Sequence, residues 1–191
     1  MLVVVLAFFT WSGIAPYDRE TWFLEMVPAF IFLLGLVFTY HRFRFSTMSY
    51  FIIMVLLIFV AIGGHYTYER VPLFNWIKDH FHLKRNHYDR VGHFAKGFIV
   101  IPLRELLLRK TELHRGKLLT VILISFVLSF AALYEIGEWL VAEVLGRSAH
   151  DFLGTQGDVW DSEWDMALAT LGSVVAFILL SKWHDKKIDS E

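Results

Sequence analysis

Acidic and histidine side chains stand in four short polar segments, and each segment borders a long apolar run. The segment GDVWDSEWDM, residues 157–166, places four acids directly before the run ALATLGSVVAFILLSKW. Carboxylates mixed with imidazoles suit Zn, Mn or Fe. A metal held by such groups can polarise a phosphoryl or carbonyl oxygen and lower the pKa of bound water to roughly 7. The chemistry these residues suggest is therefore metal-assisted hydrolysis or transfer.

The acids of residues 157–166 also have a simpler interpretation as helix caps. Ser162 and Asp165 have the spacing of a capping box, and acids in a first helical turn suit the helix dipole. Capping does not account for Asp158 and Asp161, which extend the acidic patch upstream. Asp161 and Asp165 are four residues apart and face one direction on a helix. We expect them to hold a metal or a basic group as well.

The other three polar segments each carry a pair of ionisable residues three or four positions apart. At this spacing both members of a pair share one face of a helix. The pairs are His65 and Glu69 in GGHYTYER, Asp89 and His93 in NHYDRVGHFAKGF, and Glu135 and Glu138 in LYEIGEWL.

Glu135 and Glu138 follow a long, mostly apolar stretch. Inside a membrane helix, two carboxylates repel each other and are poorly solvated, so they need cations, protons or hydrogen-bond donors nearby. A purely structural explanation requires a basic partner, which Lys96, Arg90 or Arg70 could supply. Lys96 could instead extend its ammonium to the membrane surface.

The apolar runs indicate a membrane protein. The chain has 191 residues, is 56% hydrophobic and has a mean hydropathy of +0.50, whereas soluble domains are about 45–50% apolar. A bilayer core needs about 20 apolar residues per helix. We predict an all-α, polytopic membrane protein with about six transmembrane helices, or five as an alternative, in a single integral membrane domain over residues 1–191. The expected helices lie near residues 1–14, 22–40, 48–68, 90–108, 118–140 and 162–183.

Two of the six expected spans are weaker than the others. Residues 90–108 carry His93, Lys96, Arg104 and Glu105. Residues 1–14 are short and could be the apolar core of a signal peptide, but they lack a basic n-region and an A-x-A-like cleavage site. We therefore interpret residues 1–14 as a first membrane helix.

The distribution of lysine and arginine predicts the orientation. These residues are denser in the connections that would share a side with both termini than in the longer connections opposite. Because cytoplasmic loops are enriched in them, we expect both termini in the cytoplasm. With alternating helices, all four polar segments then meet at the extracytoplasmic face.

Several classes of function find no support in the sequence. The net charge of −1 and the lack of a basic stripe give no reason to expect nucleic acid as a partner. The chain has no cysteine, which excludes disulfides and thiolate metal sites. No HExxH, GxSxG or P-loop motif occurs, so no motif identifies a reaction.

Four strings resemble the YjdF-type bacterial inner-membrane proteins. They are GGHYTYERVPLFNWI, RNHYDRVGHFAKGF, YEIGEW and FLGTQGDVWDSEWDM, and the resemblance extends from about residue 20 to residue 183. This family has no assigned biochemical activity. The resemblance therefore implies a bacterial inner-membrane location and the fold class more than a function.

A more remote resemblance is to the VanZ-like membrane proteins, which are associated with glycopeptide-antibiotic resistance. Their D-K-x-x-H element is similar to Asp89–His93, with Arg in place of Lys, and their E-x-x-Q element to Glu135–Glu138, with Glu in place of Gln. Their D-x-x-x-N-x-x-G element is similar to Asp165, Ala169 and Gly172, where the Asn is missing. This resemblance implies a common polar site and no particular reaction.

We predict a metal-dependent enzyme that hydrolyses or transfers a lipid or lipid-linked head group at the extracytoplasmic face of the bacterial inner membrane. The expected partners are thus a membrane lipid or a lipid-linked small molecule, and the expected cofactor is a divalent metal, Zn, Mn or Fe. His65, Glu69 and Asp161 could act as bases or support the ligands, and Lys96 could neutralise phosphate. The expected metal ligands are Asp89, His93, Glu135, Glu138 and Asp165.

Two other classes of function remain open. Buried carboxylates and a lysine are also what a proton- or cation-coupled transporter uses, although the sequence gives no sign of broken helices or repeated halves. A non-catalytic scaffold would use the same acids and bases to hold the helices together. Removing one acid from such a scaffold would leave a buried base unpaired and destabilise the fold.

Overall fold

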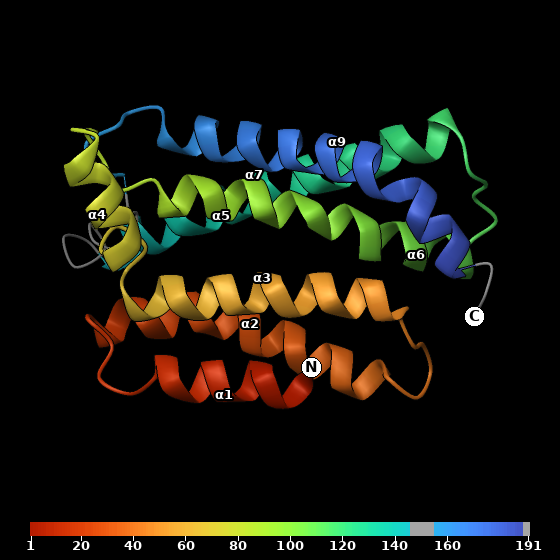
Figure 1. Ribbon diagram of the computed structural model, residues 1–191, viewed down its shortest axis with the longest axis horizontal. Helices are drawn as coiled ribbons and strands as arrows, with labels where there is room; N and C mark the ends of the chain where they lie inside the picture. Colours follow the sequence, from red (N-terminus) through yellow and green to blue (C-terminus); the bar gives the residue numbers. More distant parts are fainter. Residues whose placement is uncertain (146–154, 189–191) are drawn as a thin grey trace.

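The computed structural model describes residues 1–145 and 155–188, and every regular element in these ranges is a helix, as the all-α prediction requires (Figure 1). Helices α1 (Leu2–Ser12), α2 (Arg19–Thr39) and α3 (Thr47–His65) lie together on one side. Helix α4 (Pro72–His80) stands across one end. The other later helices lie on the other side. They are α5 (Tyr88–Lys96), the 3₁₀-helix η1 (Gly97–Ile99), α6 (Val100–Lys110), α7 (Lys117–Leu145) and α9 (Asp161–Ile188).

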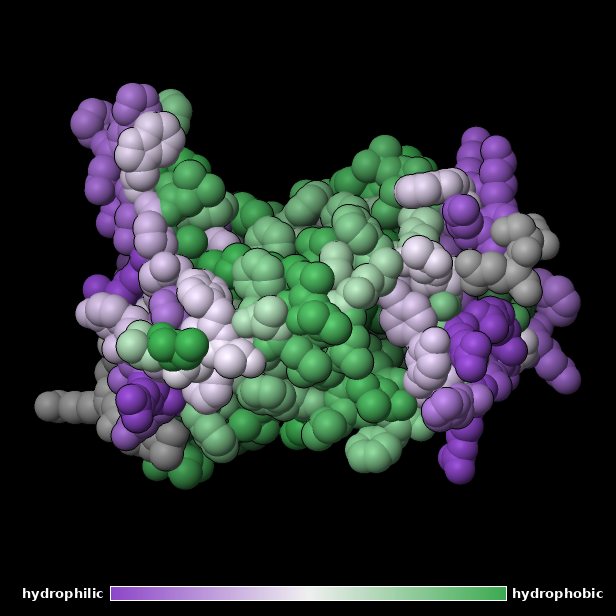
Figure 2. Space-filling model, turned by 60° about the horizontal axis from the view of Figure 1, so that its bottom comes forward, coloured by the Kyte–Doolittle hydropathy of each residue, from purple (hydrophilic) through white to green (hydrophobic). Residues whose placement is uncertain are grey.

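Four helices, α2, α3, α7 and α9, are long and apolar enough to cross a membrane. They run side by side along the long axis, and Figure 2 shows a band of apolar side chains between two hydrophilic ends. The prediction of a polytopic membrane protein is confirmed at this level. Six long spans are not present in the described residues, because α1 has 11 residues and extends only about 16 Å.

The helix expected at residues 90–108 is interrupted. Helices α5 and α6 are separated by the single 3₁₀ turn η1, and the expectation of unbroken helices was therefore wrong here. Pro102 lies in the first turn of α6. A proline has no N–H to donate and its ring clashes with the carbonyl four residues earlier, which belongs to Phe98 in η1. The tighter 3₁₀ turn relieves that clash.

Helix α3 ends at His65, three residues before the predicted end at residue 68. The carbonyl of Gly63 accepts hydrogen bonds from the N–H groups of Tyr66 and Tyr68, at 3.1 and 2.8 Å, and Thr67 and Tyr68 have positive φ angles. The ring of Tyr68 then lies against Gly63, where any Cβ would collide with it. The chain turns away into α4, which we did not predict and which begins with Pro72 at its first turn.

Helix α9 packs so closely against α5 and η1 that their backbone atoms are in contact. A Cβ on Gly97 would collide with the carbonyl of Ala169, and a Cβ on Gly172 would collide with the carbonyl of Phe94. In a membrane, where lipid is as apolar as leucine, such small residues let helices approach closely and gain dispersion and polar contacts. This contact fixes the first turns of α5 and α9 beside each other.

A buried polar network closes the end of the molecule at which α6 ends and α3 begins, called here the α6 end. Glu105 is fully buried. One of its oxygens accepts from the N–H of Ser46 and from Arg109, both at 2.7 Å. The other accepts from the hydroxyls of Ser46 and Ser49, at 2.7 and 2.6 Å, and lies 3.3 Å from Nε2 of His184.

The same network continues onto α9. Arg104 lies 3.1 Å from Nδ1 of His184 and donates to Asp185 at 2.6 Å. Since a guanidinium can only donate, Nδ1 of His184 accepts and Nε2 carries the proton given to Glu105. Both Glu105 oxygens and both His184 nitrogens are therefore satisfied, and the network ties α3, α6 and α9 together.

Replacing Gly172 by alanine should destabilise the protein, because the added Cβ has no space against the carbonyl of Phe94. Overpacking of this kind costs about 2 kcal/mol, or about 4–8 °C in melting temperature for a chain of this size. Thermal unfolding in detergent measures the shift. Gly35→Ala is the matched control, since a Cβ at Gly35 in α2 meets nothing within 4 Å. Equal melting temperatures for the two variants would contradict the close contact.

Candidate functional site

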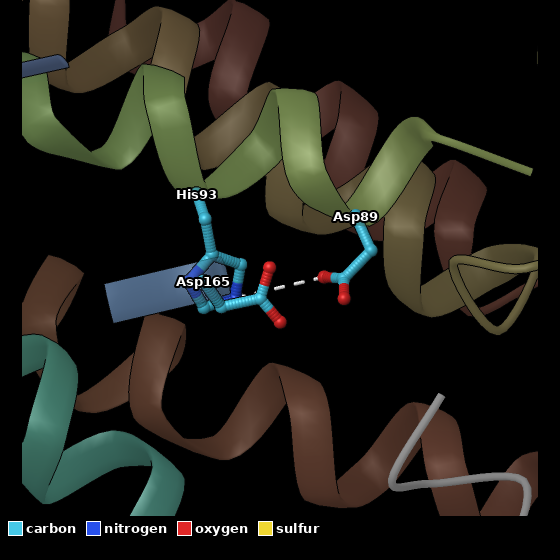
Figure 3. Close-up of side chains that lie close together, drawn as sticks. All are labelled: Asp89, His93 and Asp165. Carbon is cyan, nitrogen blue, oxygen red and sulfur yellow. Dashed lines mark ion pairs between the residues drawn. The ribbon is translucent and has the colours of Figure 1, made fainter. Parts of the chain in front are cut away.

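Asp89, His93 and Asp165 come together at the end of the molecule where α5 and α9 begin, called here the α4 end (Figure 3). Asp89 and His93 are one turn apart on α5, and Asp165 is one turn into α9. One ligand atom from each lies within 4.8 Å of the others. Ligand atoms around a tetrahedral metal with bonds of 2.0–2.2 Å lie about 3.3–3.6 Å apart. The three side chains would therefore have to move closer together, by up to about 1.5 Å, to bind one ion.

Glu135 and Lys96 border this group. Nε2 of His93 lies 3.6 Å from Oδ1 of Asp89 and 3.9 Å from Oε1 of Glu135. Nζ of Lys96 lies 3.0 Å from the same Nε2 and 4.5 Å from the ring centre of Tyr134. The ammonium therefore points into the protein and does not extend to the membrane surface.

Glu25 is a further member of the group that the sequence analysis missed. It is buried in α2, and the hydroxyl of Tyr134 donates to its Oε2 at 3.0 Å. A signal was present, because Glu25 is a lone acid inside an apolar run long enough to cross a membrane. Such acids usually face a polar interior.

Acids outnumber bases in this region, which we call the polar cluster. Each of its five carboxylates interacts electrostatically with Lys96. A set of five acids around one ammonium cannot all be ionised at low dielectric without further positive charge, as protons or as a cation. The polar cluster consists of His93 and Lys96 with the carboxylates Glu25, Asp89, Glu135, Glu138 and Asp165.

The polar cluster also contains buried atoms that make no hydrogen bond within the described part of the chain. They are Nδ1 of His93, Oε1 of Glu135 and Oδ1 of Asp165. The hydroxyl of Tyr68, whose ring lies 5.8 Å from Nζ of Lys96, is a fourth. Such atoms cost free energy unless something else binds them. The network around Glu105 has the opposite character, because its carboxylate and imidazole atoms are satisfied by protein groups.

Asp161 is used differently from its neighbours. It forms a buried ion pair with Arg85 and lies 3.7 Å from Arg90, while Arg90 also pairs with Asp158. These bonds tie the connection before α5 to the start of α9. The backbone N–H of Trp160 and the guanidinium of Arg90 lower the pKa of Asp158. Because it pairs with Arg85 and lies close to Arg90, Asp161 holds the starts of α5 and α9 together, and these two arginines balance its charge.

The predicted capping box of Ser162 and Asp165 is not formed. Helix α9 begins at Asp161, and the N–H of Trp164 donates to the carbonyl of Trp160 at 3.0 Å. Ser162 consequently lies within the first turn. The carboxylate of Asp158 accepts instead from the N–H of Trp160, at 3.0 Å, just before the helix. Asp165 is buried and has no part in the cap.

His65 and Glu69 do not share a helix face, because α3 ends at His65. Nδ1 of His65 lies 3.0 Å from the carbonyl of Ser12, and its ring stacks on Trp11 with centres 4.5 Å apart. Glu69 pairs with Arg70 at 2.9 Å. These contacts link the end of α3 to α1 and to the turn that follows it, and they involve no member of the polar cluster.

His87 lies immediately before α5 and is the other histidine of this segment. Burial lowers its pKa, and the guanidiniums of Arg90 and Arg85 lower it further. The imidazole is therefore neutral at pH 7.

A cavity of about 300 Å³ leads from the apolar surface to the polar cluster. Glu25, Lys96 and Tyr134 line its polar part, and the rest is apolar, with Phe32 of α2 and Leu57 of α3 among its walls. An apolar chain with a polar end matches such a cavity.

Asp161→Asn should destabilise the protein strongly, because it removes the buried carboxylate that pairs most closely with Arg85. Breaking a buried ion pair from one side costs about 3–5 kcal/mol. Asp158→Asn is the matched control, since Asp158 is more exposed and should lose far less stability. Denaturation in detergent compares the two variants with the wild type. A loss for Asp161→Asn no larger than that of the control would show that the buried pair does not hold α9 in place.

Residues 1–186 match the family described as "Predicted membrane protein (DUF2238)". A curated relative, "Inner membrane protein YjdF" of Escherichia coli (strain K12), is 35% identical over 179 residues, which is 93% of this chain and 86% of the relative. No solved structure matches. The predicted resemblance to YjdF-type proteins and the predicted inner-membrane location are confirmed. The more remote resemblance to VanZ-like proteins gains no support from these matches.

Proposed function

The chain belongs to the family of predicted membrane proteins (DUF2238), and we propose that it is a metal-dependent enzyme acting on a lipid or lipid-linked head group. The observation that carries the proposal is the convergence of Asp89, His93 and Asp165, whose ligand atoms lie within 4.8 Å. Buried atoms without hydrogen-bond partners on His93 and Asp165 support it. The reaction would be hydrolysis or transfer of a phosphoester or ester.

Asp89, His93 and Asp165 would hold a divalent metal, Zn, Mn or Fe, with Glu135 as a fourth ligand. When bound, the metal would polarise the scissile group and supply a water of lowered pKa. The positive charge would also satisfy the excess of carboxylates in the polar cluster. Lys96 would move from His93 toward the phosphate, and a carboxylate of the polar cluster would take up a proton as the base.

The cavity lined by Glu25, Lys96 and Tyr134 supports a lipid substrate. Most of its lining is apolar, as a hydrocarbon chain requires, and its polar part lies next to His93 through Lys96. A chain in the cavity would place its head group against the ammonium. Binding energy from the chain would then position the reacting group.

The orientation of the polar cluster follows from the charges at the other end. We propose that α1 and the composite α5–η1–α6 join the four long helices as membrane passes, which would give the domain six. Arg42, Arg44, Arg109, Lys110 and Arg115 all lie at the α6 end. Enrichment in lysine and arginine favours the cytoplasm for that end and the extracytoplasmic side for the polar cluster.

A scaffold or a transporter explains these features less well. The network around Glu105 is what a scaffold requires, with its carboxylate and imidazole atoms paired, and the carboxylates and imidazole of the polar cluster differ from it in their unpaired atoms. Between the two lie Val100 and Ile101, which are fully buried in an apolar core. This core interrupts any polar path between the two ends, which a proton or cation conduit would need.

Elemental analysis of the purified protein, prepared without a histidine tag or chelator, tests the metal. We expect about one equivalent of metal in the wild type and its loss in Asp89→Asn and Asp165→Asn. Glu163→Gln is the matched control, an exposed acid two residues before Asp165, and should keep its metal. Absence of metal from the wild type after refilling with Zn, Mn and Fe would refute the proposal.

Lys96→Met tests the substrate separately from the metal. The variant should retain its metal, because Lys96 is not a ligand. Release of phosphate from phospholipids and lipid-linked phosphates should fall by about 10- to 100-fold, the effect of one charge-assisted hydrogen bond. Unchanged turnover in this variant would exclude Lys96 from phosphate binding.

A further inference from the structure

A second cavity, of about 360 Å³, lies at the α6 end and is lined by cationic side chains from two separate segments. Arg42 and Arg44 come from the connection between α2 and α3, and Arg109 and Lys110 from the end of α6. His41 and Phe43 complete the lining, so no acidic residue contributes to it.

The shape of this cavity is held by specific contacts. Arg109 donates to the carbonyl of Arg44 and to the buried carboxylate of Glu105, both at 2.7 Å. The ring of Phe43 lies 4.6 Å from the guanidinium of Arg109 and 5.4 Å from the ammonium of Lys110. Arg109 and Lys110 are thus arranged around Phe43, and the lining of the cavity itself holds no carboxylate to balance its positive charge.

An apolar groove of about 470 Å³ adjoins the cationic cavity, because His41 lines both. The groove runs between α1, α2 and α3 and is lined by residues such as Leu36, Val37 and Met54. A free phosphate would use only the cationic cavity. A molecule with a phosphate and a hydrocarbon chain would fill both.

We propose that this cavity and groove bind one anionic phospholipid, with its phosphate among Arg42, Arg44, Arg109 and Lys110 and an acyl chain in the groove. Arginine and lysine at a membrane surface attract anionic head groups, and charge-assisted hydrogen bonds to phosphate hold them. This site is independent of the polar cluster, which lies at the other end of the molecule, and its test does not depend on any enzymatic activity.

Native mass spectrometry of the full chain in a mild detergent tests the site. The wild type should bind phosphatidylglycerol in preference to phosphatidylcholine of the same chain length. In the double variant Arg42→Gln, Lys110→Gln the affinity for phosphatidylglycerol should fall by about tenfold or more, the effect of two surface cations. The charge-matched control is Lys182→Gln, Lys186→Gln, which changes two exposed lysines of α9 outside the cavity, and it should bind like the wild type.

A second variant separates a lipid from a free anion. Val37→Trp would fill the groove and leave the cationic cavity unchanged, so it should weaken phosphatidylglycerol binding while binding of inorganic phosphate stays as in the wild type. Equal loss in the two double variants, or no loss in Arg42→Gln, Lys110→Gln, would overturn the proposal. So would inorganic phosphate that binds as tightly as phosphatidylglycerol.

Discussion

The contact between η1 and α9 determines where the polar cluster of this protein lies. Gly97 and Gly172 bring the two backbones to a distance that no larger residue would allow. Because the helices meet there, Asp89 and His93 are placed opposite Asp165 a few turns away. A side chain at either glycine would push α9 outward and separate the ligand atoms. The geometry of the polar cluster thus depends on residues that take no part in it.

Two groups of buried polar side chains lie at opposite ends of the composite helix α5–η1–α6. They differ in whether their buried carboxylate and imidazole atoms have hydrogen-bond partners. The network around Glu105 satisfies its carboxylate and imidazole atoms with serines, arginines and a histidine. The polar cluster brings five carboxylates to one lysine and leaves buried atoms unpaired. The first is stable as it stands, whereas the second requires a further positive charge. The same residue types therefore serve rigidity at one end and suit ligand binding at the other.

Topology alone predicted the central part of the site. Alternating helices were enough to bring Asp89, His93, Glu135 and Asp165 to one end, because chain direction decides on which side each helix end lies. The details that failed depend on local contacts. The break at η1 comes from Pro102, and the separation of His65 from Glu69 comes from the turn that Gly63 allows. Glu25 was not predicted as a member of the polar cluster, because its hydrogen-bond partner, Tyr134, is 109 residues away in the sequence.

The position of Lys96 bears on how the protein is made. The five acids of the polar cluster are enclosed among the helices, where each lone charge is costly. With its ammonium between His93 and Tyr134, Lys96 is the internal counter-ion of a chain that holds no metal. Under the proposed function, a metal that enters later would compete with this ammonium for the same carboxylates. Insertion of the chain and loading of the metal would then be two separate events, and the lysine that supports the first would be released by the second.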